Sequence, residues 1–394
     1  MKPVRLMLVL LLGLPALSTA ASQPPAGTEM SRPAVTAGGF VYLAGMGPVD
    51  ASGKVVGADV GAQTTRVLDN LAALLVRHGS RLERVAAVTV CLRNQADFAA
   101  MNEVYARYWP KDPPTRTTVI VAPMEPGALV EISMVALPDG VDRRVVLPAG
   151  WAKPSSPYSY AIRSGDTLFL SGLVSRNGRD NSVVAGDMKM QTGQVLSNAA
   201  EILKAAGMAM ADVVSARAYI TNTAMFQDMN AAYRAAFPAS PPARATVKVG
   251  LTSAQHLVEI TLLAVRGAGR QIITTPNPDR TPGTPNPLLS SAVRMGNRLF
   301  LSGMLGASDA NRGDAAAQAR ETLARIGRTL EAAGFKWSDV ADGVVYLPKA
   351  GDLSAVDSAY RGVFGSTFPA LTIVEAGLVS PDALVEIMMT AAKR

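Results

Sequence analysis

The chain has 394 residues, too many for one ordinary hydrophobic core and enough for two or three domains. Hydrophobic residues make up 48% and charged residues 18%, a balance that excludes long disordered regions. The net charge of +7 is mild for this length, and the basic residues are dispersed rather than gathered in runs with aromatic residues. No nucleic-acid partner is therefore expected.

The N-terminus has the pattern of a secretory signal peptide. Lys2 and Arg5 supply positive charge, an almost wholly apolar run covers 6–17, and 18–20 is a small-x-small cleavage pattern. The apolar run is shorter than the ~20 residues of a membrane-spanning helix, so an uncleaved anchor is the weaker interpretation. We therefore predict a signal peptide at 1–20 and a periplasmic or secreted protein that has no membrane contact after cleavage.

Residue types that bind metals or act as nucleophiles are scarce. Cys91 is the only cysteine, so it cannot form an internal disulfide, and its apolar neighbours predict a buried structural thiol. The two histidines, His78 and His256, are distant in sequence and indicate neither a metal site nor a hydrolase triad. We predict that the chain has no metal site.

One pattern occurs three times along the chain. A glutamate follows each of Gln63, Gln191 and Gln318 at the same spacing, and the three intervening stretches align without a gap. The shared columns include the glycines Gly79, Gly207 and Gly334, the tyrosines Tyr105, Tyr233 and Tyr360, the prolines Pro114, Pro242 and Pro369, and the glutamates Glu131, Glu259 and Glu386. This agreement indicates tandem copies of one unit of roughly 110 residues.

The elements of a copy follow from its hydrophobic periodicity. An apolar strand that ends in a small residue and a glycine comes first, followed by a helix that is clearest where Leu323, Ile326 and Leu330 precede Gly334. Next come a strand, a second helix with the shared tyrosine, and two strands separated by a short turn. The predicted middle strands cover 85–92, 213–220 and 340–347. This order predicts an α+β fold in which two helices cover one face of a mixed sheet.

The copies and the segments between them define the predicted domains. They are the signal peptide at 1–20, unit 1 at 28–138, unit 2 at 149–267, a linker at 268–287 and unit 3 at 288–394. The linker is rich in proline and glycine, so we expect an extended surface segment that proteases cut readily.

Two copies combine an arginine with the closing glutamate. Arg116 precedes Glu131 by the same interval that separates Arg244 from Glu259. If the last two strands of a copy form a hairpin that turns near 123–124, each arginine faces its own glutamate across the sheet. A structural ion pair is then one interpretation.

Copy 3 weakens that interpretation, because Leu371 occupies the arginine column while Glu386 is kept. The other interpretation is a ligand site. The planar fork of arginine suits a carboxylate, and a nearby glutamate can orient or deprotonate a water molecule. Together they suggest hydrolysis of a small α-substituted acid.

These residues resemble the signature of the RidA (YjgF) family. The likeness rests on Pro-Ala-Arg before one apolar strand, Val-Glu-Ile in the last strand, the strand ending in Ser-Gly, the Gln-Thr of the first helix and the Met-Asn-x-x-Tyr of the second. Copy 2 matches best, and the likeness covers nearly all of each copy.

The resemblance implies a chorismate-mutase-like unit that assembles as a trimer with ligand sites between subunits. Three copies in one chain then imply an intramolecular pseudo-trimer and a monomeric protein. The implied activity is that of a 2-iminobutanoate/2-iminopropanoate deaminase, which converts 2-imino or enamine acids to 2-keto acids and ammonia without a cofactor. The implied carboxylate binders are Arg116 and Arg244, the implied water positioners are Glu131 and Glu259, and the implied lining residues are Tyr158, Ser171, Gly172, Asn102 and Asn230.

Departures from the family pattern limit this expectation. Copy 3 has Leu371 for the arginine and Asp357 for the asparagine, so its own site is expected to be inactive. Copy 1 has Ala44 where the others have serine, and Ser31 falls about where copy 2 has Tyr158. At most two inter-unit clefts would therefore hold an arginine.

Two functions other than an enzyme stay open. The chain could bind a small carboxylate without chemistry, or it could be a structural protein with vestigial clefts. Replacing Arg116 and Arg244 separates the enzyme from the binder, because an enzyme loses turnover and a binder only affinity. A ribonuclease finds no support, since the histidines for general acid–base catalysis are missing.

Overall fold

The structure, a computed structural model, describes residues 30–393. The predicted signal peptide lies outside the described residues. No helix within 30–393 is long and apolar enough to cross a membrane.

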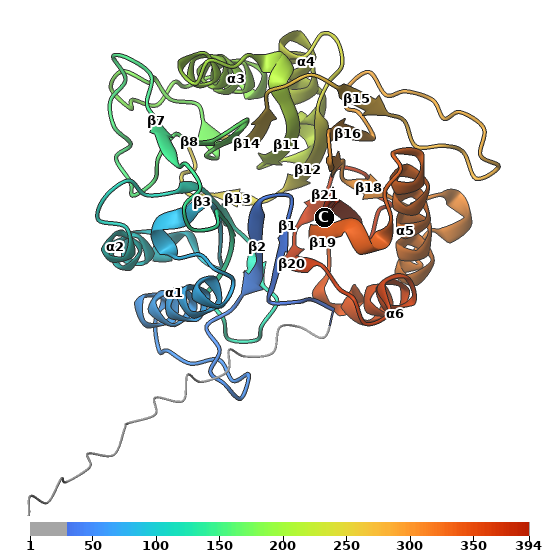
Figure 1. The fold of residues 1–394 in the computed structure, drawn as a ribbon, viewed down its shortest axis with the longest axis horizontal. Coiled ribbons are helices and arrows are strands. Elements are labelled where there is room, and N and C mark those ends of the chain that lie inside the picture. Colours follow the sequence, from blue (N-terminus) through green and yellow to red (C-terminus); the bar gives the residue numbers. More distant parts are fainter. Residues whose placement is uncertain (1–29, 394) are drawn as a thin grey trace, which may run out of the picture.

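Three α+β units follow one another and share the order of their main elements, while units 2 and 3 have two additional short strands each in the described chain (Figure 1). Unit 1 contains β1 (Ala34–Ala37), β2 (Phe40–Met46), α1 (Val60–Arg77), β3 (Val85–Leu92), α2 (Phe98–Tyr108), β4 (Thr115–Ile120), β5 (Ala122–Pro123) and β6 (Val130–Ala136). Unit 2 contains β7 (Arg144–Val146), β8 (Ala161–Ser164), β9 (Thr167–Leu170), β10 (Leu173–Val174), α3 (Met188–Ala205), β11 (Val213–Ile220), α4 (Phe226–Ala236), β12 (Ala243–Lys248), β13 (Gly250–Leu251) and β14 (Val258–Val265). Unit 3 contains β15 (Arg270–Ile273), β16 (Ala292–Met295), β17 (Arg298–Leu301), β18 (Met304–Leu305), α5 (Ala315–Ala332), β19 (Val340–Leu347), α6 (Leu353–Phe364), β20 (Ala370–Glu375), β21 (Gly377–Leu378) and β22 (Glu386–Ala392).

The strand between the two helices lies in the middle of each sheet. In unit 1, β3 pairs in parallel with β4 and antiparallel with β6, and β2 and β1 continue the sheet beyond β6. The order β1-β2-β6-β3-β4 recurs as β8-β9-β14-β11-β12 and as β16-β17-β22-β19-β20. The predicted middle strands are confirmed, and their nearly continuous apolar sequence reflects burial on both faces.

The predicted hairpin of the last two strands is wrong, because β3 lies between β4 and β6. Arg116 is level with Val88 of β3, whereas Glu131 is level with Cys91, so the two are not cross-strand partners. The segment after β4 does not turn back at once, since β5 first pairs with β20 of unit 3.

The two helices of each unit pack on one face of its sheet, as predicted. Their apolar sides join the inner sheet residues in three separate cores, one for each unit. The first helix of each unit begins after an aspartate whose side chain accepts a hydrogen bond from the N–H three residues later. The glycines that follow these helices, Gly79, Gly207 and Gly334, have φ of 68°, 70° and 74°.

The repeated glutamine ties the first helix to the loop before the last strand. In unit 1, Gln63 Nε2 donates to the Gly127 carbonyl at 3.2 Å, and Gln63 Oε1 accepts from the Leu129 N–H at 2.7 Å. Gln191 and Gln318 make the equivalent bonds in units 2 and 3. The glutamine column of the sequence is therefore structural.

The sheet faces that the helices leave uncovered meet at the centre of the molecule (Figure 1). Three short strand pairs join the units there: β13 of unit 2 with β4 of unit 1, β21 of unit 3 with β12 of unit 2, and β5 of unit 1 with β20 of unit 3. Each unit is thus joined to both others in a closed ring. This arrangement is consistent with the expected intramolecular pseudo-trimer.

The predicted linker at 268–287 is only in part an exposed loop. Its first residues form β15, which pairs with β16 along the edge of the unit 3 sheet. Thr275 and Pro276 then pack on α5, where Arg328 Nε donates to the Pro276 carbonyl at 3.0 Å. Residues 277–287 are almost all exposed, so protease cleavage is expected within this stretch of the linker.

Candidate functional site

Strand β4 carries Arg116 into the interface between units 1 and 2. The Arg116 N–H donates to Ser171 Oγ at 2.9 Å, and the Arg116 carbonyl accepts from the Gly172 N–H at 3.1 Å. Ser171 Oγ in turn donates to the Ser159 carbonyl at 2.6 Å. The predicted lining residues Ser171 and Gly172 therefore fix the arginine backbone across the interface.

The Arg116 guanidinium is buried among aromatic rings. Its Cζ atom lies 4.8 Å from the centroid of the Tyr105 ring. The rings of Phe98 and Tyr158 lie 5.7 Å and 6.0 Å away. Nη1 of Arg116 has no hydrogen-bond partner within the described part of the chain. A buried, unsatisfied guanidinium costs free energy, so this position is suited to an anionic ligand.

The carboxyl group that interacts electrostatically with this arginine belongs to unit 2. Glu259 Oε1, on β14, accepts from the Thr118 N–H of unit 1 at 3.3 Å, two residues after Arg116. Burial raises the pKa of Glu259 to about 8, against the opposing effects of the Thr118 N–H and Arg116. We call this site between units 1 and 2, with Arg116 of unit 1 and Glu259 of unit 2, the first cleft; Glu131 is not part of it.

A second cleft repeats the geometry between units 2 and 3. The Arg244 N–H donates to Ser302 Oγ at 2.8 Å, and its Cζ lies 4.4 Å from the Tyr233 ring centroid. Arg244 Nη2 donates to Asn230 Oδ1 at 2.7 Å, while its Nε has no partner among residues 30–393. The carboxyl here is Glu386, whose pKa burial raises to about 8.

The third cleft, between units 3 and 1, has Leu371 at the arginine position. The Leu371 N–H donates to Ser31 Oγ at 2.8 Å, so Ser31 supplies the acceptor that Ala44 lacks. Glu131 lies in this cleft beside Gly45, whose N–H donates to Thr372 Oγ1 at 3.1 Å. Burial raises the pKa of Glu131 to about 8 as well.

The other predicted residues separate between the clefts. Tyr158 lies in the first cleft and Asn230 contacts the arginine of the second. Asn102, at the equivalent position in unit 1, does not bond Arg116, since its Oδ1 has no partner in the described chain. Cys91 is buried, as expected. The described residues contain no group of three or more potential metal ligands.

Two features of the clefts go beyond the expectations from the sequence. Glu386 belongs to the copy expected to be inactive, yet it completes the second cleft. The tyrosine column has a role as well, because Tyr105 and Tyr233 stack on the two guanidinium groups. The tyrosine column itself was the available signal, because it accompanies each arginine.

The three buried glutamates predict that the protein loses stability as the pH rises. Burial holds the pKa of each at about 8, above the ordinary 4.5 of an unfolded chain, so the folded state binds more protons between these values. The stabilisation that these three groups provide is fully present below pH 4.5, the unfolded pKa, and is lost as the pH rises through the folded pKa of about 8. Urea midpoints should therefore fall from about pH 6 to about pH 8. In the triple variant E131Q/E259Q/E386Q this fall should be smaller. An equal fall would show that these three glutamates do not cause the pH dependence.

Comparison with known proteins gives the same repeat. The sequence pattern of the family described as endoribonuclease L-PSP matches residues 20–137, 151–266 and 281–393. A stretch of 115 residues is 44% identical to a RutC family protein of Sulfurisphaera tokodaii and covers 29% of this chain and 92% of that protein. Another stretch of 105 residues is 40% identical to the 3-aminoacrylate deaminase RutC of Acinetobacter baylyi. It covers 26% of this chain and 83% of that protein.

The likeness to solved structures also extends beyond a single unit. A crystal structure of a chorismatase aligns over 79% of this chain and 93% of the chorismatase chain, with a TM-score of 0.51 and 18% identity. At this identity the likeness is one of fold alone. The three family matches together cover most of the chain. The chain therefore belongs to the family described as endoribonuclease L-PSP, the RidA family, and carries three copies of its unit in tandem.

Proposed function

We propose that the chain hydrolyses 2-imino acids and their enamine tautomers to 2-keto acids and ammonia in the two clefts that contain arginine. One observation carries this proposal. In each of these clefts a buried guanidinium with an unsatisfied nitrogen lies near a buried carboxyl group of raised pKa from the next unit. The likeness to a 3-aminoacrylate deaminase supports the same class of reaction.

The arginine selects the substrate by its carboxylate. Arg116 is held by backbone bonds to Ser171 and Gly172 and by the Tyr105 ring, so its fork is fixed before a ligand arrives. A substrate carboxylate that accepts from the free nitrogen supplies the anion that the site lacks. Arg244 is oriented in the same way by Ser302 and Asn230.

The raised pKa lets the glutamate begin the reaction as an acid. At neutral pH the Glu259 carboxyl is largely protonated and donates its proton to the imine nitrogen, which makes the carbon more electrophilic. The resulting carboxylate takes a proton from water as the water oxygen bonds to that carbon. The tetrahedral intermediate carries a hydroxyl and an amino group.

The same glutamate completes the hydrolysis. Glu259, protonated again, donates to the amino nitrogen, the C–N bond breaks, and ammonia leaves. The hydroxyl proton returns to the carboxylate as the C=O bond of the keto acid forms. Water is consumed, ammonia and keto acid are released, and Glu259 ends in its starting state. Glu386 performs the same steps beside Arg244.

The double variant R116L/R244L tests this function. Leucine is the matched replacement, because Leu371 occupies the same position in unit 3 without loss of the fold. An amino-acid oxidase supplies 2-imino acid, and keto-acid formation is followed with and without the protein. We expect wild-type acceleration and a fall to the uncatalysed rate in the double variant, with each single variant retaining part of the rate. No acceleration by the wild type with any imino acid would overturn the proposal in favour of a carboxylate-binding protein.

A further inference from the structure

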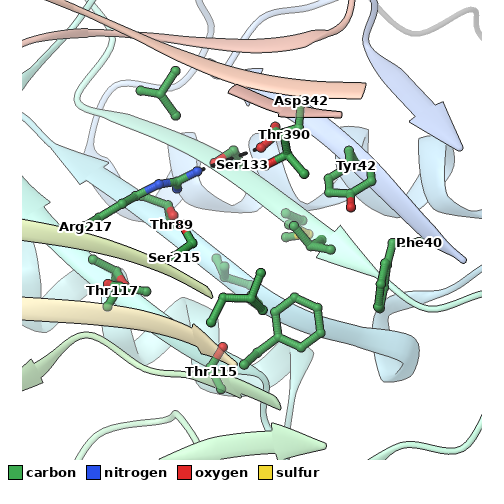
Figure 2. A pocket seen from close by; sticks show the side chains of 18 of the residues that line it. Phe40, Tyr42, Thr89, Thr115, Thr117, Ser133, Ser215, Arg217, Asp342 and Thr390 are labelled. Atoms are coloured by element: carbon green, nitrogen blue, oxygen red, sulfur yellow. Dashed lines mark hydrogen bonds and ion pairs between the residues drawn. The ribbon is translucent and has the colours of Figure 1, made fainter. Parts of the chain in front are cut away.

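A cavity of about 120 Å³ lies at the centre of the ring, where the uncovered faces of the three sheets meet (Figure 2). One water molecule needs roughly 10–15 Å³ on this measure, so the cavity has room for several waters or one small organic molecule. The arginine and glutamate side chains of the first and second clefts, Arg116, Arg244, Glu259 and Glu386, do not line it.

Equivalent residues of the three units close one end of this central cavity. Phe40, Thr167 and Arg298 each begin a strand there. Arg298 Nη1 donates to Thr167 Oγ1 at 2.7 Å, and its Cζ lies 5.7 Å from the Phe40 ring centroid. Arg298 also pairs with Asp166 at 2.7 Å, so its charge is already compensated. At the other end, the next inward-facing layer of the middle strands is the buried set Cys91, Tyr219 and Tyr346.

Between these ends the three units contribute unequal side chains. One layer contains Ala87, Ser215 and Asp342, and the next contains Thr89, Arg217 and Val344. A homotrimer would place the same side chain at a position three times, which for arginine would gather three like charges. The single chain instead has one Arg217 from unit 2 and one Asp342 from unit 3.

These two charges form an ion pair with each other. Arg217 Nη2 lies 3.8 Å from Asp342 Oδ2, which is too long for a hydrogen bond, and the side chains are 26% and 16% exposed. Figure 2 shows the Arg217 side chain extended toward Asp342, and both line the cavity. The lining also has many hydroxyl groups, among them those of Thr89, Thr117, Ser133, Ser215, Thr261 and Thr390.

Apart from Arg298, the cavity therefore presents one positive and one negative group, with hydroxyl groups and an apolar side in the rest of its lining. In the view of Figure 2 the rings of Phe40 and Tyr42 lie across the cavity from Arg217. Phe169 and Phe300 add further aromatic surface to the lining. A complementary ligand has no net charge, carries opposite charges a few ångströms apart, and has an apolar group.

We propose that the central cavity binds a zwitterionic α-amino acid with an apolar side chain. Its carboxylate bonds to Arg217, its ammonium group bonds to Asp342, and its side chain lies against the aromatic rings. A 2-keto acid has no ammonium group for Asp342, so the cavity prefers a different compound from the ligands of the clefts. This site does not depend on the activity proposed above.

Isothermal titration of the full chain with L-leucine and L-phenylalanine tests the site. The expected result is one equivalent bound per chain, with affinity at least about tenfold weaker in R217T and in D342A, the loss typical of removing one charge-assisted bond. These replacements introduce the residue types that unit 1 has at the equivalent positions, the threonine of Thr89 and the alanine of Ala87. The ketone analogue 4-methyl-2-oxopentanoate and the amine 3-methylbutylamine, each with one of the two charges, should bind the cavity at least about tenfold more weakly than leucine.

The cleft variant R116L/R244L is the control, and it should bind the amino acids as the wild type does. Loss of binding in R116L/R244L with retention in R217T would place the amino acid in the clefts and overturn the proposal. The absence of binding by both amino acids would also overturn it. A crystal structure of the wild type with L-leucine provides a test that does not depend on variants: density for leucine away from Arg217 and Asp342 rejects the site.

Discussion

The double variant E259Q/E386Q is expected to hydrolyse 2-imino acids about 10²–10⁴ times more slowly than the wild type, the usual contribution of a general acid–base group. Glutamine keeps the shape of the buried side chain but cannot donate and regain a proton. The measurement is the oxidase-coupled formation of keto acid, with circular dichroism to verify the fold.

Glu131→Gln is the matched control for this experiment. Glu131 is as buried as the other two glutamates and its pKa is raised in the same way, but its cleft contains Leu371 instead of an arginine. We expect E131Q to retain nearly the full wild-type rate. An equal loss in E131Q would mean that the arginine-free cleft is active and would contradict the assignment of the two active clefts.

The pairing of Arg116 with Glu259 across units can be tested by asking whether substitutions of the two residues are additive. In a background with R244L, where only the first cleft acts, R116L and E259Q should not be additive, because either change removes the same site. E131Q in that background should leave the rate unchanged. Coupling between Arg116 and Glu131 instead would restore the pairing within one unit that the strand order excludes.

Gly172→Ala and Gly303→Ala are expected to inactivate the first and second cleft respectively. A Cβ atom at Gly172 would lie 1.8 Å from Glu259 Oε1, and one at Gly303 would lie 1.8 Å from Glu386 Oε1. Both distances are far below van der Waals contact, so each carboxyl group must leave its position. Each single variant should lose the share of activity of one cleft, and the double variant should fall to the uncatalysed rate.

Gly193→Ala serves as the control for these substitutions. Gly193 lies in α3, and a Cβ atom there would meet nothing within 4 Å. This change should leave activity intact and stabilise the helix by up to about 1 kcal/mol. Full activity of the G172A/G303A double variant would show that the positions of the two glutamates are not needed for the reaction.

The parts of the fold that follow from local pattern could be predicted from the sequence. The middle strands begin and end at the expected residues, because their apolar runs are bounded by turns within a few positions. The first helix of each unit ends two residues before Gly79, Gly207 or Gly334, because glycine adopts the positive φ that follows a helix end. Gapless alignment of the copies then extended each local prediction to all three units.

The partner of each arginine could not be predicted in this way. Arg116 and Glu131 have a spacing that suits a hairpin, and nothing in their neighbourhood shows that β5 leaves to pair with β20, a strand of unit 3 that lies far away in the sequence. The same limit applies to Ser31, whose hydroxyl replaces that of the missing serine at Ala44 by bonding Leu371 of another unit. Contacts between distant segments depend on how the three sheets pack, and the periodicity of one segment does not contain that information.

The closed ring of β4–β13, β12–β21 and β20–β5 pairs also decides how the protein responds to dilution. These links are only two residue pairs each, and in a trimer of separate chains such interfaces dissociate as the concentration falls. Tethering keeps neighbouring units at an effective concentration on the order of millimolar, whatever the concentration of the protein. Clefts built from two units thus stay assembled in a single molecule, and their specific activity should not change with enzyme concentration. Because the units are covalently joined, none can be exchanged for a unit of another molecule. Arg217 of unit 2 and Asp342 of unit 3 therefore always occur together at the centre.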